Sequence, residues 1–226
     1  YLQMGIIRNA VNFPSIRPKD YEKIRPYLVL AEKLGSLQGQ LVSPIQRLEI
    51  EYSGAEFLEV PIQPLTQTVI KGLLDPILAE KVNLVNAHLL LKQRQIELVT
   101  STSSEASGYT GQITVRARGK QVESSVSGAV FQGGEPRLVR INNYRLEAEL
   151  EGINILVHNQ DKPGIIGFIG TTLGSYDVNI ANMHLSRAPE RDKAMAIILV
   201  DNEAPQEALQ ALRNNPHILS VQQVRL

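Results

Sequence analysis

The order of short apolar runs in the C-terminal third of the chain is the feature that most limits its fold. Four runs rich in β-branched and other apolar residues are predicted strands, at residues 153–158, 179–185, 193–200 and 218–226. Two helices are predicted between them, one starting near Asp161 and one at Pro205. The resulting order, β-α-β-β-α-β, is that of two split βαβ units. It predicts a ferredoxin-like sandwich with both helices on one face of an antiparallel sheet.

The first of these two helices has the clearest local signals. Asp161 is its predicted N-cap, and Pro163 falls in its first turn. A buried face is predicted from apolar residues at four-residue intervals, namely Ile165, Ile169 and Leu173. A strand that leads directly into such a helix presents backbone N–H groups at the helix start.

Residues 10–148 predict a second, less regular α/β domain. A helical stripe covers residues 21–34, with Pro26 expected in its first turns and Gly35 near its end. The other expected elements are a strand with one wet face at 47–52, helices at 65–77 and 85–91, and strands at 96–101, 112–118 and 122–131, with a hairpin turn at Gly119-Lys120. We therefore expect an α+β chain with a domain boundary near Gly152.

The composition excludes several kinds of site. The 226 residues include no Cys, which removes disulfides, thiolate zinc sites, iron–sulfur clusters and cysteine nucleophiles, and favours a cytoplasmic setting. The 23 basic and 23 acidic residues balance, so we expect no nucleic-acid partner. No apolar run reaches the roughly 18 residues of a membrane-spanning helix, so we expect no membrane partner. The four histidines lack metal-ligand spacing and the glycines do not fit the dinucleotide fingerprint, so we expect no metal and no catalytic residue here.

The strongest candidate site surrounds the start of the helix after residue 161. Its backbone N–H groups and dipole suit a carboxylate or phosphate, and Gly164 leaves room for close approach. Asp161 could pair with an ammonium group, while Asn159 and Asn179 could donate and accept hydrogen bonds on either side. The alternative is structural: Asp161 only caps the helix and Asn179 only starts a strand.

A second candidate, for an anion, is formed by three arginines close together in sequence, Arg137, Arg140 and Arg145. Guanidinium groups can hold a phosphorylated anion through paired hydrogen bonds. Three glutamates lie nearby, Glu135, Glu147 and Glu149, so the alternative is a solvated, charge-balanced surface.

Two sets of motifs resemble known families. Residues 161–166, Leu173-Gly174 and residues 178–181 resemble the ACT domain, a small-molecule-sensing βαββαβ module. The chain as a whole is similar to the C-terminal half of long-form D-3-phosphoglycerate dehydrogenases, in motifs at residues 8–14, 30–35, 71–74, 82–87 and 152–154. The resemblance implies a remnant of a catalytic part at residues 1–9, an intervening domain at 10–148 and an ACT domain at 152–226.

This resemblance implies a regulatory and oligomerisation role. In the family, a separate catalytic part oxidises 3-phosphoglycerate with NAD in serine biosynthesis, and the present residues would hold no cofactor themselves. The family's effector positions fall on Asn159, Asp161 and Asn179, with Gly164 and Ile165 at the helix start, and Ile180 follows Asn179. ACT domains of this type pair side by side into homo-oligomers, so Asn179 of one copy would face Asn159 and Asp161 of another.

Two positions depart from the family pattern. Asn159 stands where other members have His or Tyr, and His158 is expected to point to the opposite strand face. Glu149 stands where some members have Arg. Despite these two departures, the resemblance implies L-serine or a similar amino acid as effector. A purely structural scaffold and the accessory part of an amino-acid dehydratase are the alternatives.

Overall fold

The computed structural model describes residues 18–105, 108–190 and 192–226. The chain divides into two compact units, the first ending at Val139 and the second comprising Arg140–Leu226, and each is described by itself. The predicted catalytic remnant at residues 1–9 lies outside the described residues. The bounds expected for the two domains, 10–148 and 152–226, stay a prediction.

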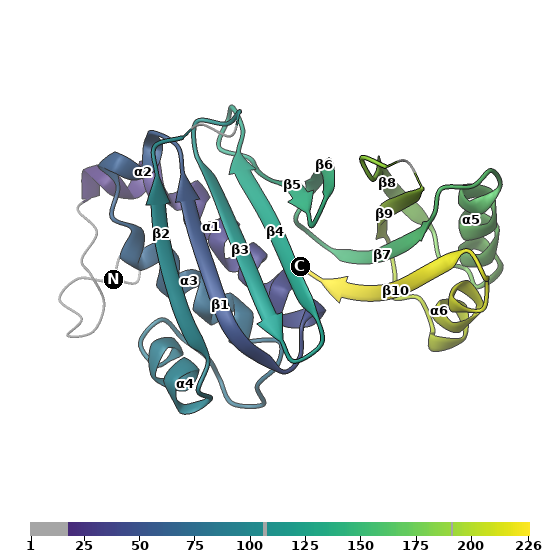
Figure 1. Ribbon diagram of the computed structural model, residues 1–226, viewed down its shortest axis with the longest axis horizontal. Helices are drawn as coiled ribbons and strands as arrows, with labels where there is room; N and C mark the ends of the chain where they lie inside the picture. The colour runs from purple at the N-terminus through teal and green to yellow at the C-terminus, as the bar shows by residue number, and fades with distance from the viewer. Residues whose placement is uncertain (1–17, 106–107, 191) are drawn as a thin grey trace. The chain divides into compact units, whose positions relative to one another are not determined.

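A mixed sheet has the strand order β2-β1-β3-β4-β5-β6, and its strands β1 to β4 lie in the first unit (Figure 1). β1 (Ile45–Ser53) pairs in parallel with β2 (Glu97–Ser103) and antiparallel with β3 (Gln112–Gly119), which pairs antiparallel with β4 (Glu123–Val130). β5 (Pro136–Ile141) and β6 (Tyr144–Glu149) complete the order, and the chain passes into the second unit within β5. The expected hairpin between β3 and β4 is confirmed, with the Gly119 N–H donating to the Val122 carbonyl at 2.8 Å.

Helices pack against one face of this sheet. α1 (Pro18–Leu41) lies along α3 (Ile62–Leu74), and α1 also contacts β3 and β4. Two further helices are shorter. α2 (Glu56–Glu59) follows β1, and α4 (Ala87–Gln93) follows α3. Leu48, Ile50 and Tyr52 alternate with charged residues along β1 and are fully buried against the helices, so the strand predicted there is confirmed.

Three glycines allow α1 and α3 to approach very closely. A Cβ atom placed at Gly35 would lie 2.2 Å from the Val69 carbonyl oxygen, and one at Gly39 would lie 2.2 Å from the Leu73 carbonyl oxygen. From the other helix, a Cβ at Gly72 would lie 2.2 Å from the Glu32 carbonyl oxygen. The two backbones therefore touch where any side chain would separate them.

The expectations about the first helix were wrong at both ends. Pro26 lies inside α1 rather than in its first turns, and Gly35 lies in the helix interior, because α1 continues to Leu41. Glycine normally weakens a helix, but here the contact with α3 requires it. The β5–β6 hairpin was missed because its charged residues suggested a solvated surface, although Asn142, with φ of 49°, marks its turn.

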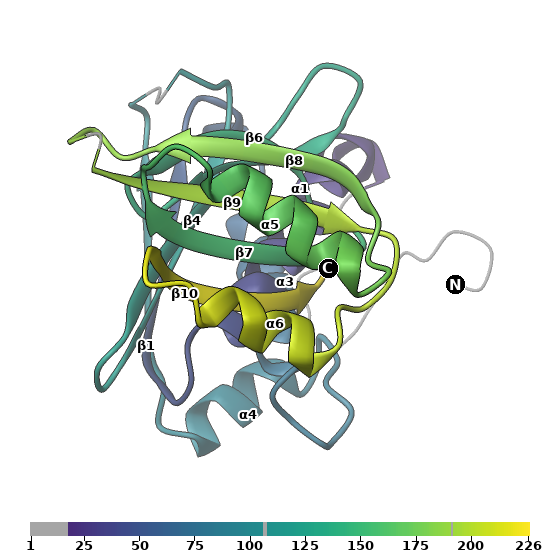
Figure 2. The ribbon, with the colours of Figure 1, turned by 90° about the vertical axis from the view of Figure 1, so that its right-hand side faces the viewer.

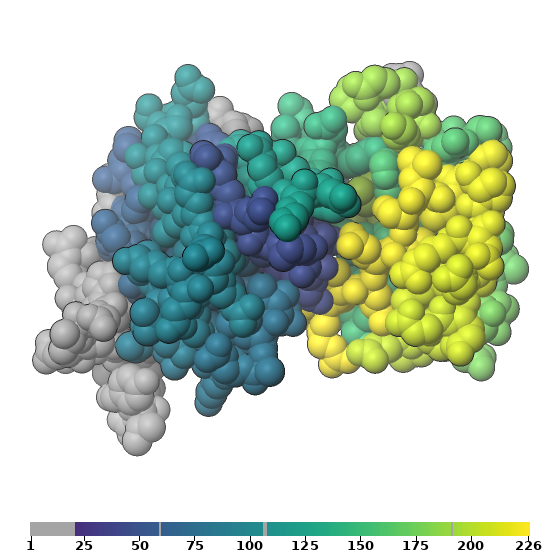
Figure 3. All heavy atoms as spheres, turned by 60° about the horizontal axis from the view of Figure 1, so that its bottom comes forward, coloured from purple at the N-terminus to yellow at the C-terminus, as the bar shows by residue number. Residues whose placement is uncertain are grey.

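The second unit contains the predicted β-α-β-β-α-β order. Its elements are β7 (Ile153–Gln160), α5 (Ile165–Ser175), β8 (Ile180–Arg187), β9 (Lys193–Val200), α6 (Gln206–Arg213) and β10 (Ile218–Arg225). The sheet has the order β10-β7-β9-β8, its neighbouring strands are antiparallel, and both helices lie on one face (Figure 2). This confirms the expected ferredoxin-like fold. Figure 3 shows the α6 and β10 residues as one continuous surface, in yellow.

The core of the second unit lies between the sheet and its two helices. Ile165, Ile169 and Leu173 are buried there, as the four-residue spacing predicted. The predicted N-cap was wrong. Gly164 caps α5 in the left-handed region, with φ of 90°, because Asp161 still belongs to the strand pattern: its N–H donates to the Asp192 carbonyl at 2.9 Å.

Candidate functional site

Strand register places the predicted effector residues at two opposite ends of the second unit's sheet. Along β9, Ala194 pairs with Asn159 of β7, whereas Val200 pairs with Ile180 of β8. Ala194 and Val200 are six residues apart on β9, which corresponds to about 20 Å at about 3.3 Å per residue. One copy of the chain therefore does not bring the two groups together.

The first end contains a buried side chain with an unused acceptor. Asn159 is 2% exposed and shares its strand face with Ile155 and Val157 of the core. Its Nδ2 donates to the Gln160 carbonyl at 2.6 Å, but its buried Oδ1 has no hydrogen-bond partner among the described residues. An unpaired buried acceptor costs about 1–3 kcal/mol, so this atom is a natural point of attachment for a donor.

Asp161 lies at the same end and holds an ion pair that the sequence did not indicate. Its Oδ2 accepts from Arg187 Nε at 2.8 Å. The Asp161 side chain is 20% exposed, whereas that of Arg187 is 63% exposed, so the arginine side of the pair faces water. Such exposed pairs contribute little to stability, and another cation could replace Arg187 at small cost. The only signal for this contact was the antiparallel register, which aligns Arg187 with Ala194 and hence with Asn159.

The helix start beside these residues is open. Gly164 is exposed, and no atom lies within 4 Å of the position that a Cβ would take there. Ile165 follows it and is 4% exposed, with its side chain in the core. A helix start has unpaired backbone N–H groups and the positive end of the helix dipole. In α5 the Ile165 N–H already donates to the Lys162 carbonyl at 3.5 Å, so the N–H groups available to a ligand are those that follow Ile165.

The second end contains Asn179 and Ile180. Asn179 is exposed, and its Nδ2 donates to Asp201 Oδ2 at 2.7 Å while its carbonyl accepts from the Asp201 N–H at 3.2 Å. Ile180 is partly buried and packs against the core. The second donor and the Oδ1 acceptor of the Asn179 amide are the groups that could face a neighbouring molecule.

The three arginines of the candidate anion site do not share one surface. Arg137 and Arg140 are three residues apart on β5, so they point to opposite strand faces. Arg137 Nη2 donates to Glu135 Oε2 at 2.7 Å, which gives it a carboxylate partner in the chain. Arg140 and Arg145 are exposed on the facing strands β5 and β6.

A tyrosine–histidine contact lies on the opposite face of the sheet from Asn159. His158 points away from the helices, as expected, and its Nε2 is 2.7 Å from the Tyr144 hydroxyl on β6. The two rings meet edge to face at 5.5 Å. Burial lowers the pKa of His158 and Lys193 adds to this, while Asp192 opposes it. Sequence reasoning missed Tyr144 because it missed the hairpin.

The second unit thus has the β-α-β-β-α-β fold of a small regulatory domain, and it is joined to a second α/β domain. Residues 153–217 match the ACT domain family, and residues 23–142 match the family of D-3-phosphoglycerate dehydrogenase intervening domains. The chain belongs to the D-3-phosphoglycerate dehydrogenase intervening-domain family and carries an ACT domain. These two domains support a regulatory role.

Curated relatives agree with this assignment. Over 97% of its length the chain is 36% identical to a D-3-phosphoglycerate dehydrogenase of Synechocystis, and over 100% it is 32% identical to one of Methanocaldococcus jannaschii. Over 90% it is 32% identical to D-3-phosphoglycerate dehydrogenase 2, chloroplastic, of Arabidopsis thaliana. The chain spans 35–43% of the length of these relatives. Among the described helices, none is long and apolar enough to cross a membrane.

Proposed function

We propose that this chain is the regulatory and oligomerisation part of an NAD-dependent D-3-phosphoglycerate dehydrogenase of serine biosynthesis. Its ACT domain would sense L-serine or a similar amino acid. The match to both domain families and the names of the relatives support the parent activity. The buried, unpartnered Oδ1 of Asn159, next to an open helix start, is the observation that carries the sensing role.

An α-amino acid complements the groups at this end of the sheet. Its carboxylate would accept from the N–H groups that follow Ile165, and its ammonium would pair with Asp161 in place of the exposed Arg187. A donor on the ligand, such as the serine hydroxyl, would satisfy Asn159 Oδ1.

A complete site requires a second copy of the chain. Asn179 lies about 20 Å from Asn159 within one copy, at about 3.3 Å per strand residue, so it would have to come from a neighbouring ACT domain. The effector would then bind where two copies meet, and it would favour the paired arrangement over others. It could shift the parent enzyme only as far as it binds one arrangement better than another.

A purely structural scaffold is the second candidate. Asp161 and Asn179 already have partners within the chain, Arg187 and Asp201, which is what a domain that only pairs with itself would show. In that case the ACT domains would associate without any effector.

Titration calorimetry with L-serine separates the two proposals. We expect the unmodified chain to bind, and the Asp161→Asn variant to bind at least about tenfold more weakly, because a charge-assisted hydrogen bond is lost. Glu207→Gln removes an acidic residue from the first turn of α6 and is the matched control, with affinity unchanged. No heat at about 10 mM L-serine, a concentration that saturates even a millimolar site, together with an L-serine-independent dimer in sedimentation, would favour the scaffold.

The parent activity needs a separate experiment on the full-length gene product. The purified enzyme should form NADH from NAD and 3-phosphoglycerate. Failure to do so would refute the parent assignment, whatever the ACT domain binds.

A further inference from the structure

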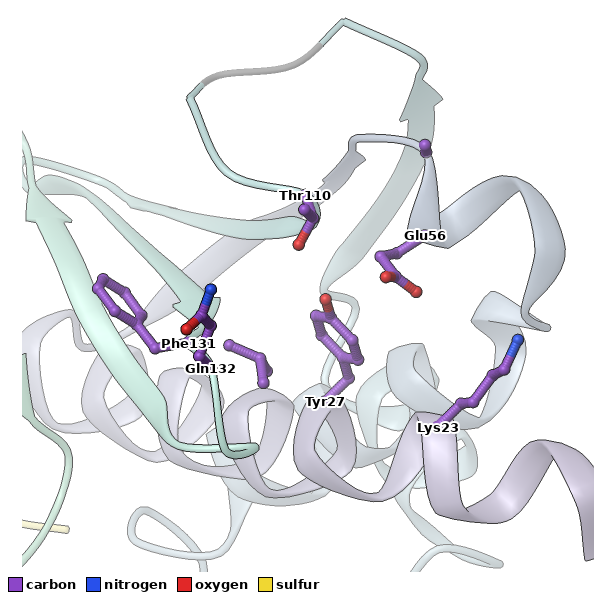
Figure 4. A pocket seen from close by; sticks show the side chains of 8 residues that line it. Lys23, Tyr27, Glu56, Thr110, Phe131 and Gln132 are labelled. Atoms are coloured by element: carbon purple, nitrogen blue, oxygen red, sulfur yellow. The ribbon is translucent and has the colours of Figure 1, made fainter.

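A pocket of about 450 Å³ opens at one end of the first unit's sheet. Its walls come from the N-terminal half of α1 and from the segments that follow β1, precede β3 and follow β4. A volume of this size is within the roughly 300–1,000 Å³ of small-molecule sites. Figure 4 labels six of the side chains that line it, Lys23, Tyr27, Glu56, Thr110, Phe131 and Gln132.

The Tyr27 hydroxyl has a fixed position in the wall of this pocket. The Tyr27 ring is buried and packs edge to face on Phe57 at 5.0 Å. A Cβ at Gly111 would lie only 2.7 Å from the hydroxyl oxygen, so the hydroxyl fills space that a side chain at residue 111 would need. The pocket therefore contains a hydroxyl that the packing of its ring orients in advance.

The ionisation of Tyr27 does not compete with its use as a hydrogen-bonding group. Burial raises the pKa of Tyr27 and the Glu56 charge adds to this, while a hydrogen bond with Thr110 opposes it. Near pH 7 the side chain is therefore a neutral hydroxyl with lone pairs that can accept a hydrogen bond.

Glu56 provides the charge that is available to a ligand. Its carboxylate points toward the Tyr27 hydroxyl (Figure 4), and its Cβ would lie 3.1 Å from a Cβ at Gly111. Within residues 18–105, 108–190 and 192–226, the partly buried Glu56 carboxylate has no ion pair and no hydrogen bond. Lys23 also lines the pocket, but it already has a partner within the chain. The available charge of the pocket is therefore negative.

The polar groups of the pocket select a cation with several N–H donors. The Glu56 carboxylate only accepts hydrogen bonds, and the hydroxyls of Tyr27 and Thr110 keep lone pairs after bonding to each other. A phosphate or carboxylate would be repelled by Glu56. A neutral alcohol could bond to the hydroxyls but would leave the carboxylate without a counter-charge. A primary ammonium provides one positive charge and three donors.

An apolar wall lies across the pocket from Glu56. Phe131 and Gln132 occupy this side (Figure 4). The Phe131 ring packs on Tyr109 with centroids 5.8 Å apart, and its backbone N–H donates to the Glu135 carbonyl at 2.8 Å. This wall suits a hydrocarbon stem attached to the ammonium group.

We propose that this pocket binds a primary alkylammonium ion, with its N–H groups at Glu56, Tyr27 and Thr110 and its apolar stem against Phe131. All of these residues belong to the first unit, which ends at Val139. The proposal does not rest on the effector site proposed for the ACT domain.

Amide NMR spectra of the ¹⁵N-labelled chain at pH 7.5, titrated with n-butylammonium chloride, test the proposal. We expect saturable shifts at Gly111 and Gln132, and at least about tenfold weaker binding in Glu56→Gln, which loses a charge-assisted hydrogen bond. Tyr27→Phe keeps the ring and should weaken binding about three- to tenfold. Glu80→Gln removes an exposed acidic residue of the same unit and is the matched control, with affinity unchanged.

Three related molecules test which part of the ligand is recognised. 1-Butanol keeps the stem without the charge, and butyrate reverses the charge. Tetramethylammonium keeps the charge but has no N–H donor. Each should bind at least about tenfold more weakly than n-butylammonium.

Three results would overturn the proposal. One is the absence of shifts at Gly111 and Gln132 at about 50 mM n-butylammonium, far above the dissociation constant of a millimolar site. Another is unchanged affinity in Glu56→Gln, with spectra that show folded protein, or equal affinity for 1-butanol. The third is that shifts occur only in the ACT domain and vanish in Asp161→Asn. Pocket shifts that persist in Asp161→Asn support the proposal, whether or not the ACT domain binds L-serine.

Discussion

Glycines serve opposite purposes in the two units. In the first unit, Gly35 and Gly72 lie where a Cβ would meet a backbone carbonyl oxygen at 2.2 Å. In the second unit, a Cβ at Gly164, Gly167 or Gly170 would find nothing within 4 Å. The first set exists so that two helices can touch, whereas the second leaves the surface of α5 bare.

This difference suggests a division of labour between the units. The first unit uses its glycines to gain a close, rigid helix pair under a sheet. The second keeps an open helix start beside the buried Asn159 acceptor, where another molecule could come close to the backbone. Substitutions and pH changes should therefore act differently on the two units.

The largest contrast should come from adding one methyl group to a glycine in each unit. Gly35→Ala should lower the free energy of unfolding by about 3 kcal/mol, because α1 and α3 must move apart. Gly167→Ala should raise it by about 0.5–1 kcal/mol, because alanine favours a helix and its methyl group meets no neighbour. Urea denaturation followed by circular dichroism measures both. If the Gly35→Ala variant were more stable than the unmodified chain, Gly35 would not be needed for the close contact between α1 and α3.

The next contrast concerns a glutamine in each unit. Gln38 is fully buried, and its Nε2 donates to the Val115 and Ser124 carbonyls at 2.6 and 2.9 Å. Gln38→Met should cost about 2 kcal/mol, because two buried acceptors lose a donor. Gln210 on α6 donates to Asn214 on the exposed surface, so Gln210→Met should change stability by under about 0.5 kcal/mol. If both variants lost the same free energy of unfolding, the two hydrogen bonds of Gln38 to β3 and β4 would not contribute to stability.

Alkaline pH should weaken the first unit through Tyr52. This side chain is fully buried, and burial raises its pKa despite a hydrogen bond to Thr66. The unfolded chain ionises Tyr52 above about pH 10 while the folded chain does not, so stability is complete below that pH. It should then fall by about 1.4 kcal/mol per pH unit. Tyr52→Phe should remove this slope, and a slope that persists in the variant would assign it to other groups.

Acid should weaken the second unit, by a smaller amount, through His158. Its pKa is lowered in the fold, so the unfolded chain takes up the proton first as the pH falls below about 6.5. The contribution is complete above that pH and is lost as the pH falls through the lowered pKa of the folded state. Because His158 is only partly buried, we expect under about 1 kcal/mol. His158→Gln, followed by thermal melts at pH 5 to 7.5, should flatten this dependence; an unchanged profile would contradict it.

The spacing of apolar residues and the turn-forming residues between strands made the second unit predictable from sequence. Its strands are short and separated by turn residues, and the spacing of Ile165, Ile169 and Leu173 identified the buried face of α5. The first unit was harder because its glycines and Pro26 read as helix ends. Their actual role depends on α3, which the local sequence does not reveal.

The candidate site was predictable in its residue types but not in its partners. The passage from strand to helix pointed to Asn159 and Asp161. The partners of the site residues, Arg187 for Asp161 and Asp201 for Asn179, are brought close only by the fold. The hairpin that carries Tyr144 was hidden because alternating charges on an edge resemble a solvated loop. The residues that line a pocket around Tyr27 come from four segments that are distant in sequence, so no local pattern predicts it.

The separation of Asn159 from Ile180 along the sheet has a consequence for how the chain would respond in a cell. If two copies complete each effector site, two-fold symmetry creates two equivalent sites per pair, so one ligand binds per chain. Binding and pairing are then linked by mass action, and apparent affinity rises with protein concentration. The amount of the protein, and not only of its effector, would set the point at which regulation begins.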